Sequence, residues 1–470
     1  MPISDLLPEL VLLIGAVLIV LYAAFTPQRV QVWTAVFAMV LLVVSFGLTL
    51  AQGAGPARLT FSGVWALDNA AIFAKLVIFA AALLAVALSP RWMSTDRRHG
   101  EYYGLVLFSV LGAVMMASAA DSMELVVGIL LSSVASYPLV AYHRSWEPSL
   151  EAGMKYFLIG ALANALLVIG VVLLFGLTGA TGYPDIAREL SDSPDAIVLM
   201  AALTLILMGL TFKLGAFPVH TWMPDVAQGA PAPVAALVTT VAKVGAAIAL
   251  ARFVALIPDE IAWRWVVALV ATVTMTWGNL AALWQTNLRR LLGWSAVSQS
   301  GYALIAITVV GVSEQAMPAL LVFLAGYAIA NTAAFGAVTY LRGRTELDDY
   351  KGLARVRPWT ATVIILALLS FLGLPPLVGF FGKLLVFEAA IDGGYLWLAV
   401  VAVINTVISL FYYLRVIAPM IFAKPGDDVA DLGWTAALPM AAAGVLVLGF
   451  GLWVRVLIEY AQQGGLLPLL

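Results

Sequence analysis

Apolar runs of about 20 residues, the length that crosses a hydrocarbon core of roughly 30 Å as a helix, follow one another along this 470-residue chain. Hydrophobic residues make up 63% of the sequence and charged residues only 11%, and the mean hydropathy is +1.02. A soluble globular domain carries many more charged residues than this. The sequence therefore predicts an all-α polytopic membrane protein without a separate soluble domain.

Fourteen spans are predicted, and two of them are too long for one crossing, at about 45–50 Å for a rise of 1.5 Å per residue. The fourteen cover residues 4–25, 30–51, 68–89, 102–119, 122–142, 151–177, 195–225, 229–252, 261–284, 291–311, 315–341, 359–391, 393–421 and 434–458. The two long spans contain the helix breakers Gly215 and Pro218, and Gly373, Pro375 and Pro376. Because proline lacks a backbone donor and clashes with the preceding turn, the seventh and twelfth helices are predicted to be discontinuous. Paired breaks of this kind are typical of inverted-repeat transporters with an ion path at the breaks.

Basic residues of the connections lie mainly on one side of the predicted membrane. Thirteen follow odd-numbered spans: Arg29, Arg91, Arg97, Arg98, Arg144, Arg289, Arg290, Arg342, Arg344, Lys351, Arg355, Arg357 and Lys424. Five are assigned to the other side: Arg58, Arg188, Arg252, Arg264 and Arg455. The positive-inside rule then makes the odd connections cytoplasmic and puts both termini on the opposite side. The first apolar run begins beside Asp5 and Glu9, unlike a signal peptide, and is interpreted as a retained helix.

Several chemistries are excluded by residue content. The chain has no cysteine and three scattered histidines, so it lacks a ligand set for an iron–sulfur cluster, a haem or a structural zinc. It contains no glycine-rich dinucleotide or phosphate loop. A net charge of −2 argues against a nucleic-acid partner.

Three lysines lie deep within predicted spans: Lys213, Lys243 and Lys383. An ionisable residue at the centre of a span costs about 2.5–3.5 kcal/mol on insertion scales and usually faces a hydrated interior. Lysine suits a proton relay because removal from water disfavours its charged form, whereas a nearby carboxylate favours it. We therefore interpret the three lysines as a polar axis for protons, with buried structural pairing as the alternative.

Supporting candidates lie near these lysines or near the span ends: Glu124, Glu151, Lys155, His220 and Glu388. Glu151 and Lys155 have the i, i+4 spacing of a local ion pair. His220 follows the first break and is either a proton carrier or a cap of the broken helix. Lys75 lies on the same helix face as Asp68 and makes either that structural pair or a lateral contact. Four tryptophans flank spans and are interpreted as interfacial anchors: Trp146, Trp222, Trp263 and Trp265.

Five stretches resemble the subunit N family of the proton-translocating NADH:quinone oxidoreductase, bacterial complex I. They are LLPELVLLI, FKLGAFPVHTWMPDVAQGAPAPV, NLAALWQTNLRRLLGWSAVSQSGYAL, LDDYKGLARVRPW and LSFLGLPPLVGFFGKLLVFEAAI. The similarity extends over nearly the whole chain. This family is one of the antiporter-like subunits and is related to the large subunits of multi-subunit cation/proton antiporters.

The resemblance implies fourteen helices with two inverted five-helix repeats, spans 4–8 and 9–13. The expected division is three N-terminal helices (1–100), a first repeat with broken helix 7 (101–257), a second with broken helix 12 (258–421) and a C-terminal helix (422–470). It also implies that Lys213, Lys243 and Lys383 are the proton-channel lysines. The location implied is the bacterial inner membrane, beside other antiporter-like and small membrane subunits. NADH or another donor, FMN, iron–sulfur clusters and quinone are expected in sister subunits, with no cofactor bound by this chain.

Two positions depart from the family pattern. Leu130 stands where the fifth helix usually carries a glutamate, and Gln299 stands where a histidine is frequent. Lys213 therefore lacks its usual carboxylate partner. Three explanations are open: another carboxylate, from Glu124 or a neighbouring subunit, replaces it; this copy is a spacer that does not pump; or the complex uses a different electron donor. A cation/proton antiporter subunit is the alternative function, and a purely structural membrane subunit is the third.

Overall fold

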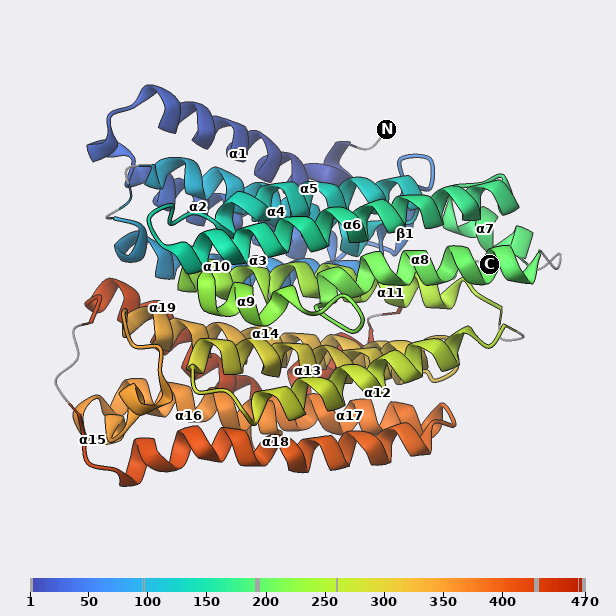
Figure 1. Ribbon diagram of the computed structural model, residues 1–470. Coiled ribbons are helices and arrows are strands. Elements are labelled where there is room, and N and C mark those ends of the chain that lie inside the picture. The colour runs from blue at the N-terminus through green and yellow to red at the C-terminus, as the bar shows by residue number, and fades with distance from the viewer. Residues whose placement is uncertain are drawn as a thin grey trace.

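The computed structural model describes residues 3–94, 96, 98–190, 195–258, 261–426, 431–463 and 465–466, so Arg97 of the orientation argument lies outside the described residues. Over these ranges the chain forms a bundle of long helices whose axes lie roughly along one line, with connections at both ends (Figure 1). Within the described part, twelve helices are long and apolar enough to cross a membrane. The predicted all-α polytopic architecture is confirmed.

Each of the first six predicted spans corresponds to one helix. The elements of this part are η1 (Ile3–Leu6), α1 (Leu7–Phe25), η2 (Gln28–Val30), α2 (Trp33–Gln52), α3 (Asn69–Met93), α4 (His99–Ser118), α5 (Ser122–Val140) and α6 (Glu147–Thr178). Two short strands, β1 (Arg58–Thr60) and β2 (Trp65–Leu67), form an antiparallel hairpin in which Arg58 faces Leu67. This hairpin and the short helix α7 (Tyr183–Leu190), which buries its apolar face, were not predicted.

The seventh and twelfth spans are discontinuous, as predicted. The seventh consists of α8 (Ala196–Leu214) and α9 (Trp222–Gly229), and the twelfth of α16 (Pro358–Leu372) and α17 (Val378–Asp392). The first half of each ends at a glycine with positive φ, +68° at Gly215 and +87° at Gly373. Glycine adopts this left-handed conformation without a Cβ penalty, and the prolines that follow prevent the helix from continuing.

A third interruption divides the eighth span, which was predicted to be continuous, into α10 (Ala232–Val238) and α11 (Val241–Ala255). Side chains of α14 (Ala316–Tyr340) hold this break. Asn331 donates hydrogen bonds to the hydroxyls of Thr239 and Thr240 at 2.7 and 2.8 Å, and the Tyr327 hydroxyl donates to the Thr239 carbonyl at 2.9 Å. The backbone opens here because its polar groups find partners on a neighbouring helix.

The C-terminal half completes the fourteen spans. Its remaining elements are α12 (Trp263–Ala282), α13 (Leu288–Thr308), η3 (Leu347–Tyr350), α15 (Leu353–Val356), α18 (Leu396–Phe422), α19 (Trp434–Leu452) and α20 (Val454–Gln462). The twelve apolar helices, the more polar α13 and the broken α16–α17 pair together match the predicted spans. The last span ends earlier than predicted, because the helix is interrupted at Trp453.

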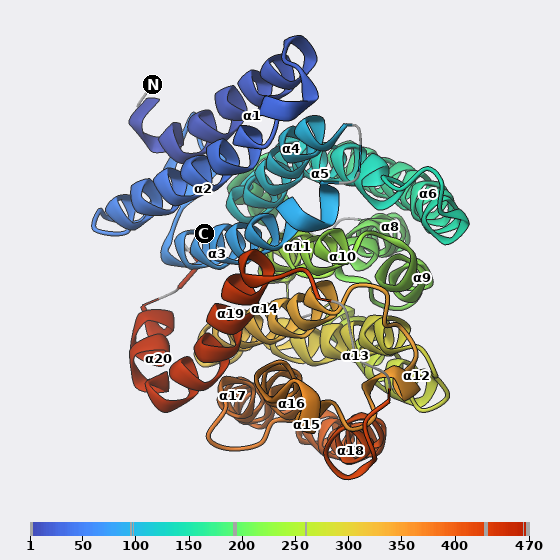
Figure 2. The ribbon, with the colours of Figure 1, turned by 90° about the vertical axis from the view of Figure 1, so that its left-hand side faces the viewer.

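The broken eighth span and the two helices α13 and α14 occupy the middle of the bundle. Seen from one end, α10, α11, α13 and α14 lie between α1–α6 on one side and α16–α18 on the other (Figure 2). Nearly all residues of α11, α13 and α14 are buried. The connections that carry most of the basic residues, including those after α14 and α18, lie at the left-hand end in Figure 1. Lys243 lies on α11 in this middle layer, and Lys213 and Lys383 lie on α8 and α17, which pack against it.

Candidate proton relay of interior lysines

Lys213 lies in the last turn of α8, directly before the first break, and is 1% exposed. Its ammonium donates to the Ser132 hydroxyl of α5 at 3.4 Å. The rings of Phe212 and Tyr156 lie 5.5 and 5.9 Å from the nitrogen. Among the described residues no carboxylate lies within ion-pairing distance of this lysine. Hydroxyl and aromatic groups thus surround the charge.

Lys243 lies in α11 just after the interruption of the eighth span and is also 1% exposed. Its ammonium donates to the Ala296 carbonyl of α13 at 2.6 Å and to the Tyr327 hydroxyl of α14 at 3.2 Å. The nitrogen lies 4.4 Å from the centre of the same tyrosine ring. Lys243 therefore connects the broken eighth span to both central helices.

Lys383 lies in α17, after the second break, and is 3% exposed. Its ammonium donates to the carbonyl of Leu372, the last residue of α16, at 3.4 Å. A helix C-terminus has carbonyls without intrahelical partners and favours a nearby cation. The ring of Tyr302 lies 4.2 Å from the nitrogen. The break itself thus supplies the acceptor for this lysine.

Polar groups of α13 and α14 lie between the three lysines. The Ser300 hydroxyl is 2.5 Å from the carbonyl of Leu214, the neighbour of Lys213, and 3.0 Å from the Ala296 carbonyl that accepts from Lys243. A cavity of about 10 Å³, close to the smallest space that holds one water molecule, is lined by Lys383, Tyr327, Gln299 and Ser370, among others. Tyr327, which the sequence reasoning missed, therefore touches Lys243 and borders the same cavity as Lys383.

Leu130, which stands where the family carries a glutamate, and Glu124, its suggested replacement, both lie away from Lys213. Leu130 faces outward on α5 and is 39% exposed, whereas Ser132 is buried on the opposite face. Glu124 lies in the first turn of α5, eight residues before Ser132, or about 12 Å along the helix axis. The structure therefore does not bring Glu124 to the lysine.

Glu151 and Lys155 form the predicted local ion pair, at 2.6 Å. Lys155 also pairs with Asp225 of α9 at 3.0 Å, and Asp225 in turn pairs with Arg290 of α13 at 2.5 Å. This network ties α6 to α9 and α13, and its members are partly exposed. It belongs to the basic end of the bundle and has no contact with the interior lysines among the interactions of the described residues.

His220 and Trp222 lie at the break between α8 and α9. The ring of His220 is buried and packs 5.9 Å from the Phe217 ring and 5.8 Å from the Trp294 ring. Its imidazole does not cap α9, which begins after Thr221 without a side-chain cap. Trp222 is 1% exposed and donates to the Phe212 carbonyl at 3.0 Å, which fastens α9 to the end of α8.

The interfacial assignment of Trp222 is therefore wrong. It is also wrong for Trp263, which is fully buried, whereas Trp265 is 53% exposed. A position at a span end cannot distinguish an anchor from a core residue, because the distinction depends on what packs against it.

Glu388 is exposed on α17 and lines a cavity of about 840 Å³ together with Glu314 and Asp392. Asp392 accepts a hydrogen bond from Ser313 at 2.5 Å. This cavity opens at the end of α17 that lies five to nine residues beyond Lys383. Carboxylates thus line an opening on the same helix as the third interior lysine.

Lys75 and Asp68 belong to two separate buried ion pairs. Lys75 pairs with Glu9 of α1 at 2.7 Å, which is the lateral contact considered above. Asp68 caps α3 by accepting from Ala71 and binds Arg252 with two bonds of 2.6 and 2.7 Å. Two helical turns, about 10 Å of rise, separate Asp68 from Lys75. Arg252, assigned to a connection from the sequence, is a buried residue of α11.

No group of three or more His, Cys, Asp or Glu side chains in the described ranges is arranged to hold a metal ion.

Comparison with known proteins shows what this arrangement is similar to. The family model of the transmembrane proteins of NADH:quinone oxidoreductase and Mrp antiporters matches residues 119–409. NADH-quinone oxidoreductase subunit N of Mycobacterium sp. (strain JLS) is 44% identical over 443 residues, which cover 93% of this chain and 94% of that protein.

Two solved structures are similar to this chain over nearly its whole length. A chain of respiratory complex I from Thermus thermophilus, solved with bound aureothin, has a TM-score of 0.84 and 31% identity, covering 98% of this chain and 100% of that one. The Mrp complex from Dietzia sp. DQ12-45-1b contains a chain with a TM-score of 0.87 and 22% identity, covering 99% and 97%. At 22% identity the second likeness concerns the fold alone.

Fold and interior lysines define an antiporter-like membrane subunit, a helical bundle with broken helices around buried charges. The chain belongs to the transmembrane family of NADH:quinone oxidoreductase and Mrp antiporter proteins. Within that family it is an antiporter-like subunit of the complex I type.

Proposed function

We propose that this chain acts as subunit N of a complex I-type NADH:quinone oxidoreductase and translocates protons along Lys213, Lys243 and Lys383 while sister subunits reduce quinone. The observation that carries the proposal is the position of Tyr327, which touches Lys243 and lines the same cavity as Lys383. Three buried ammonium groups that pair with no carboxylate in the described part of the chain are costly in a membrane. A relay that loads and releases protons accounts for that cost.

The relay runs through both halves of the bundle. In the N-terminal half, Lys213 exchanges a proton through the Ser132 hydroxyl of α5. The Ser300 hydroxyl lies between the Lys213 and Lys243 regions, and Tyr327 with one water in the small cavity connects Lys243 to Lys383. Hydroxyls and water can relay protons because each both donates and accepts a hydrogen bond. Ser300 and Tyr327 now donate to backbone carbonyls, so each passes a proton on only after its O–H turns toward the next lysine or water.

Release is assigned to the opening beside Glu388. This carboxylate lies on the same helix as Lys383, and Glu314 and Asp392 line the same cavity. A mouth lined by negative charge favours the departure of a cation from the interior. Glu388 therefore acts as the outer acceptor for protons that leave Lys383.

The carboxylate that switches Lys213 is assigned to a neighbouring subunit. Leu130 lies on the outward face of α5 and is open to a partner, whereas Glu124 is about 12 Å away along the helix from Ser132. Because Leu130 and Ser132 lie on opposite faces of α5, a partner's carboxylate at this surface acts on Lys213 across the width of the helix. Its approach favours the charged lysine, and its withdrawal favours the neutral one.

The remaining assignments follow from this role. The chain lies in the bacterial inner membrane with both termini on the periplasmic side, because the basic connections lie at one end. Residues 101–257 and 258–421 form the two inverted repeats, between the N-terminal helices (1–100) and the C-terminal helix (422–470). Other antiporter-like and small membrane subunits pack beside it, and NADH, FMN, iron–sulfur clusters and quinone belong to sister subunits.

The proposal is tested by electron transfer from NADH to quinone in membranes that contain the assembled complex. Lys213→Ala, Lys243→Ala and Lys383→Ala are each expected to reduce the rate at least about tenfold, because a positioned proton-transfer group contributes roughly 10²–10⁴-fold. Lys155→Ala is the matched control, since Lys155 belongs to the partly exposed network at the basic end. Native gels verify assembly. Wild-type rates in all three assembled variants would refute the relay.

A further inference from the structure

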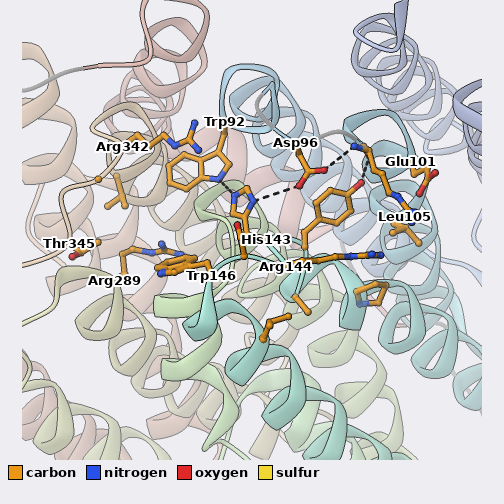
Figure 3. Close-up of a pocket in the computed structure, with 18 of the residues that line it drawn as sticks. Trp92, Asp96, Glu101, Leu105, His143, Arg144, Trp146, Arg289, Arg342 and Thr345 are labelled. Carbon is orange, nitrogen blue, oxygen red and sulfur yellow. Dashed lines mark hydrogen bonds and ion pairs between the residues drawn. The ribbon is translucent and has the colours of Figure 1, made fainter. Parts of the chain in front are cut away.

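A cavity of about 1340 Å³ opens at the basic end of the bundle, apart from the lysine relay (Figure 3). Its walls come from the end of α3 (Trp92), the start of α4 (Glu101), the connection between α5 and α6 (His143 to Trp146) and the segment that follows α14 (Arg342). None of the three interior lysines lines it. The cavity therefore needs an explanation of its own.

Positive charge dominates this cavity. Five arginines line it, Arg98, Arg144, Arg289, Arg342 and Arg344, against the two carboxylates of Asp96 and Glu101. A cleft lined mainly by one sign of charge concentrates ions of the opposite sign. The same field repels hydronium. The cavity is accordingly suited to an anion and poorly suited to serve as the entrance for protons.

Two of the arginines have donors available for a ligand. Arg289 is engaged by the carbonyls of Ala227 and Ala230 and lies over the Trp146 ring at 5.8 Å. In contrast, the exposed guanidinium groups of Arg98 and Arg144 make no hydrogen bond or ion pair with any residue that the structure describes. Arginine presents a planar fork of donors that matches phosphate oxygens in pairs.

Asp96 does not neutralise these two guanidinium groups, because its carboxylate oxygens contact other groups of the cavity wall. One oxygen accepts from the backbone nitrogen of Arg98 at 2.9 Å, and the other lies 3.9 Å from Nδ1 of His143. Nε2 of His143 accepts from the Trp92 indole at 2.9 Å, so the neutral ring carries its proton on Nδ1, toward Asp96 (Figure 3). Asp96 is thus engaged by other groups, and within the described part of the chain the guanidinium groups of Arg98 and Arg144 remain available to a ligand.

Apolar groups lie beside the charges. The same cavity is lined by Trp92, Trp146, Leu105, Pro138 and Leu150. Leu150 lies in the first turn of α6 and is 44% exposed. Basic pockets between membrane helices on the cytoplasmic side bind anionic lipid headgroups. We propose that this cavity binds a phosphate-bearing anion through Arg98 and Arg144, either the phosphodiester of an anionic phospholipid or a soluble phosphate. This site is independent of the proton relay.

Two measurements on the purified full-length chain test the site and separate its two sources. In the first, the chain is placed in phosphatidylcholine nanodiscs with about one phosphatidylglycerol in ten lipids, extracted into detergent, and scored by native mass spectrometry for retained phosphatidylglycerol. In the second, inorganic phosphate is titrated calorimetrically into the chain in phosphatidylcholine nanodiscs. The variant is Arg98→Gln with Arg144→Gln, and the control is Arg29→Gln, an exposed arginine at the same end that does not line the cavity.

The double variant is expected to weaken binding roughly thirtyfold, at about fivefold for each basic residue near an anionic headgroup, while Arg29→Gln binds like wild type. Loss of phosphatidylglycerol retention identifies a lipid site, and loss of phosphate binding identifies a soluble ligand. Because the proposed contacts are ionic, added potassium chloride must also displace the ligand from the wild-type chain. This salt dependence tests the site even if the double variant does not fold. Unchanged binding in the folded double variant, or salt-independent retention by wild type, overturns the proposal and leaves the cavity to an acidic segment of a neighbouring subunit.

Discussion

The ammonium of Lys243 lies 3.2 Å from the hydroxyl of Tyr327 and 4.4 Å from the centre of its ring. The same hydroxyl donates to the Thr239 carbonyl at 2.9 Å, at the interruption between α10 and α11. One tyrosine thus holds the broken helix open and contacts the lysine that follows the break. It also borders the cavity of Lys383. In the proposed relay, Tyr327 connects Lys243 with Lys383.

Replacement Tyr327→Phe keeps the ring beside Lys243 and removes only the hydroxyl. We expect the rate of proton pumping in vesicles with the assembled complex to fall at least about tenfold, because a positioned proton-transfer group contributes roughly 10²–10⁴-fold. Tyr302→Phe is the control, since its ring lies 4.2 Å from Lys383 while its hydroxyl bonds to Thr406, off the relay. Equal pumping by the two variants would exclude a role for the Tyr327 hydroxyl.

The paired breaks were predictable because Gly215 and Gly373, each followed by proline, are local signals. The break at Thr239 and Thr240 carries no glycine or proline. It depends on Asn331 and Tyr327, about 90 residues away in sequence, so no local pattern indicates it. The interior lysines were found by their charge within apolar runs. Tyr327 was not, because an uncharged residue in a span does not stand out.

The buried pair of Asp68 and Arg252 shows the same limit. Both side chains are fully buried and lie 184 residues apart in sequence. Arg252 was assigned to a connection because it lies at the end of a long apolar run, and a pair of Asp68 with Lys75 was one of two alternatives because the two share a helix face. Only the packing of α3 against α11 shows which charges meet.

Asp68→Asn leaves the guanidinium of Arg252 buried without its carboxylate. We expect a loss of about 3–5 kcal/mol in the free energy of unfolding, the usual result of removing one partner of a buried pair, measured by denaturant titration of the purified chain in mixed micelles. The control is Glu459→Gln, which removes the partner of the exposed Arg455 and should have no measurable effect. A similar stability of both variants would argue against this pair as a structural anchor.

Gly373→Ala tests the conformation at the second break. Gly373 has φ of +87°, and an L-residue pays roughly 1–2 kcal/mol in the left-handed region, so the variant should unfold at a lower denaturant concentration. Gly176→Ala provides the comparison, because Gly176 is a helical residue of α6 with open space around its Cβ position. Alanine there should be neutral or slightly stabilising. A stabilising effect at both positions would contradict the assigned backbone conformation.

Binding in the basic cavity should strengthen at acidic pH. Burial lowers the pKa of His143 below its ordinary value of 6.5, with Arg342 and Arg289 adding to the effect and Asp96 opposing it. His143 is therefore neutral at neutral pH and gains charge only as the pH falls below that value. Phosphatidylglycerol retention should therefore strengthen, by up to roughly fivefold, as the pH is lowered stepwise from about 7.5 to about 4.5, with the rise at a lower pH than an ordinary histidine would give. His143→Gln should abolish the difference, and a persistent pH dependence would assign it to another group.

The most direct test of the relay is proton translocation measured together with electron transfer in vesicles that contain the assembled complex with Lys243→Ala, compared with Lys155→Ala. In the proposed path Ser300 stands on the Lys213 side of Lys243, and Tyr327 on its Lys383 side. We predict that both rates fall together in the Lys243 variant by at least about tenfold, while the Lys155 variant matches wild type. Undiminished pumping and electron transfer in an assembled Lys243→Ala complex would contradict the relay and leave this chain a structural member of the complex.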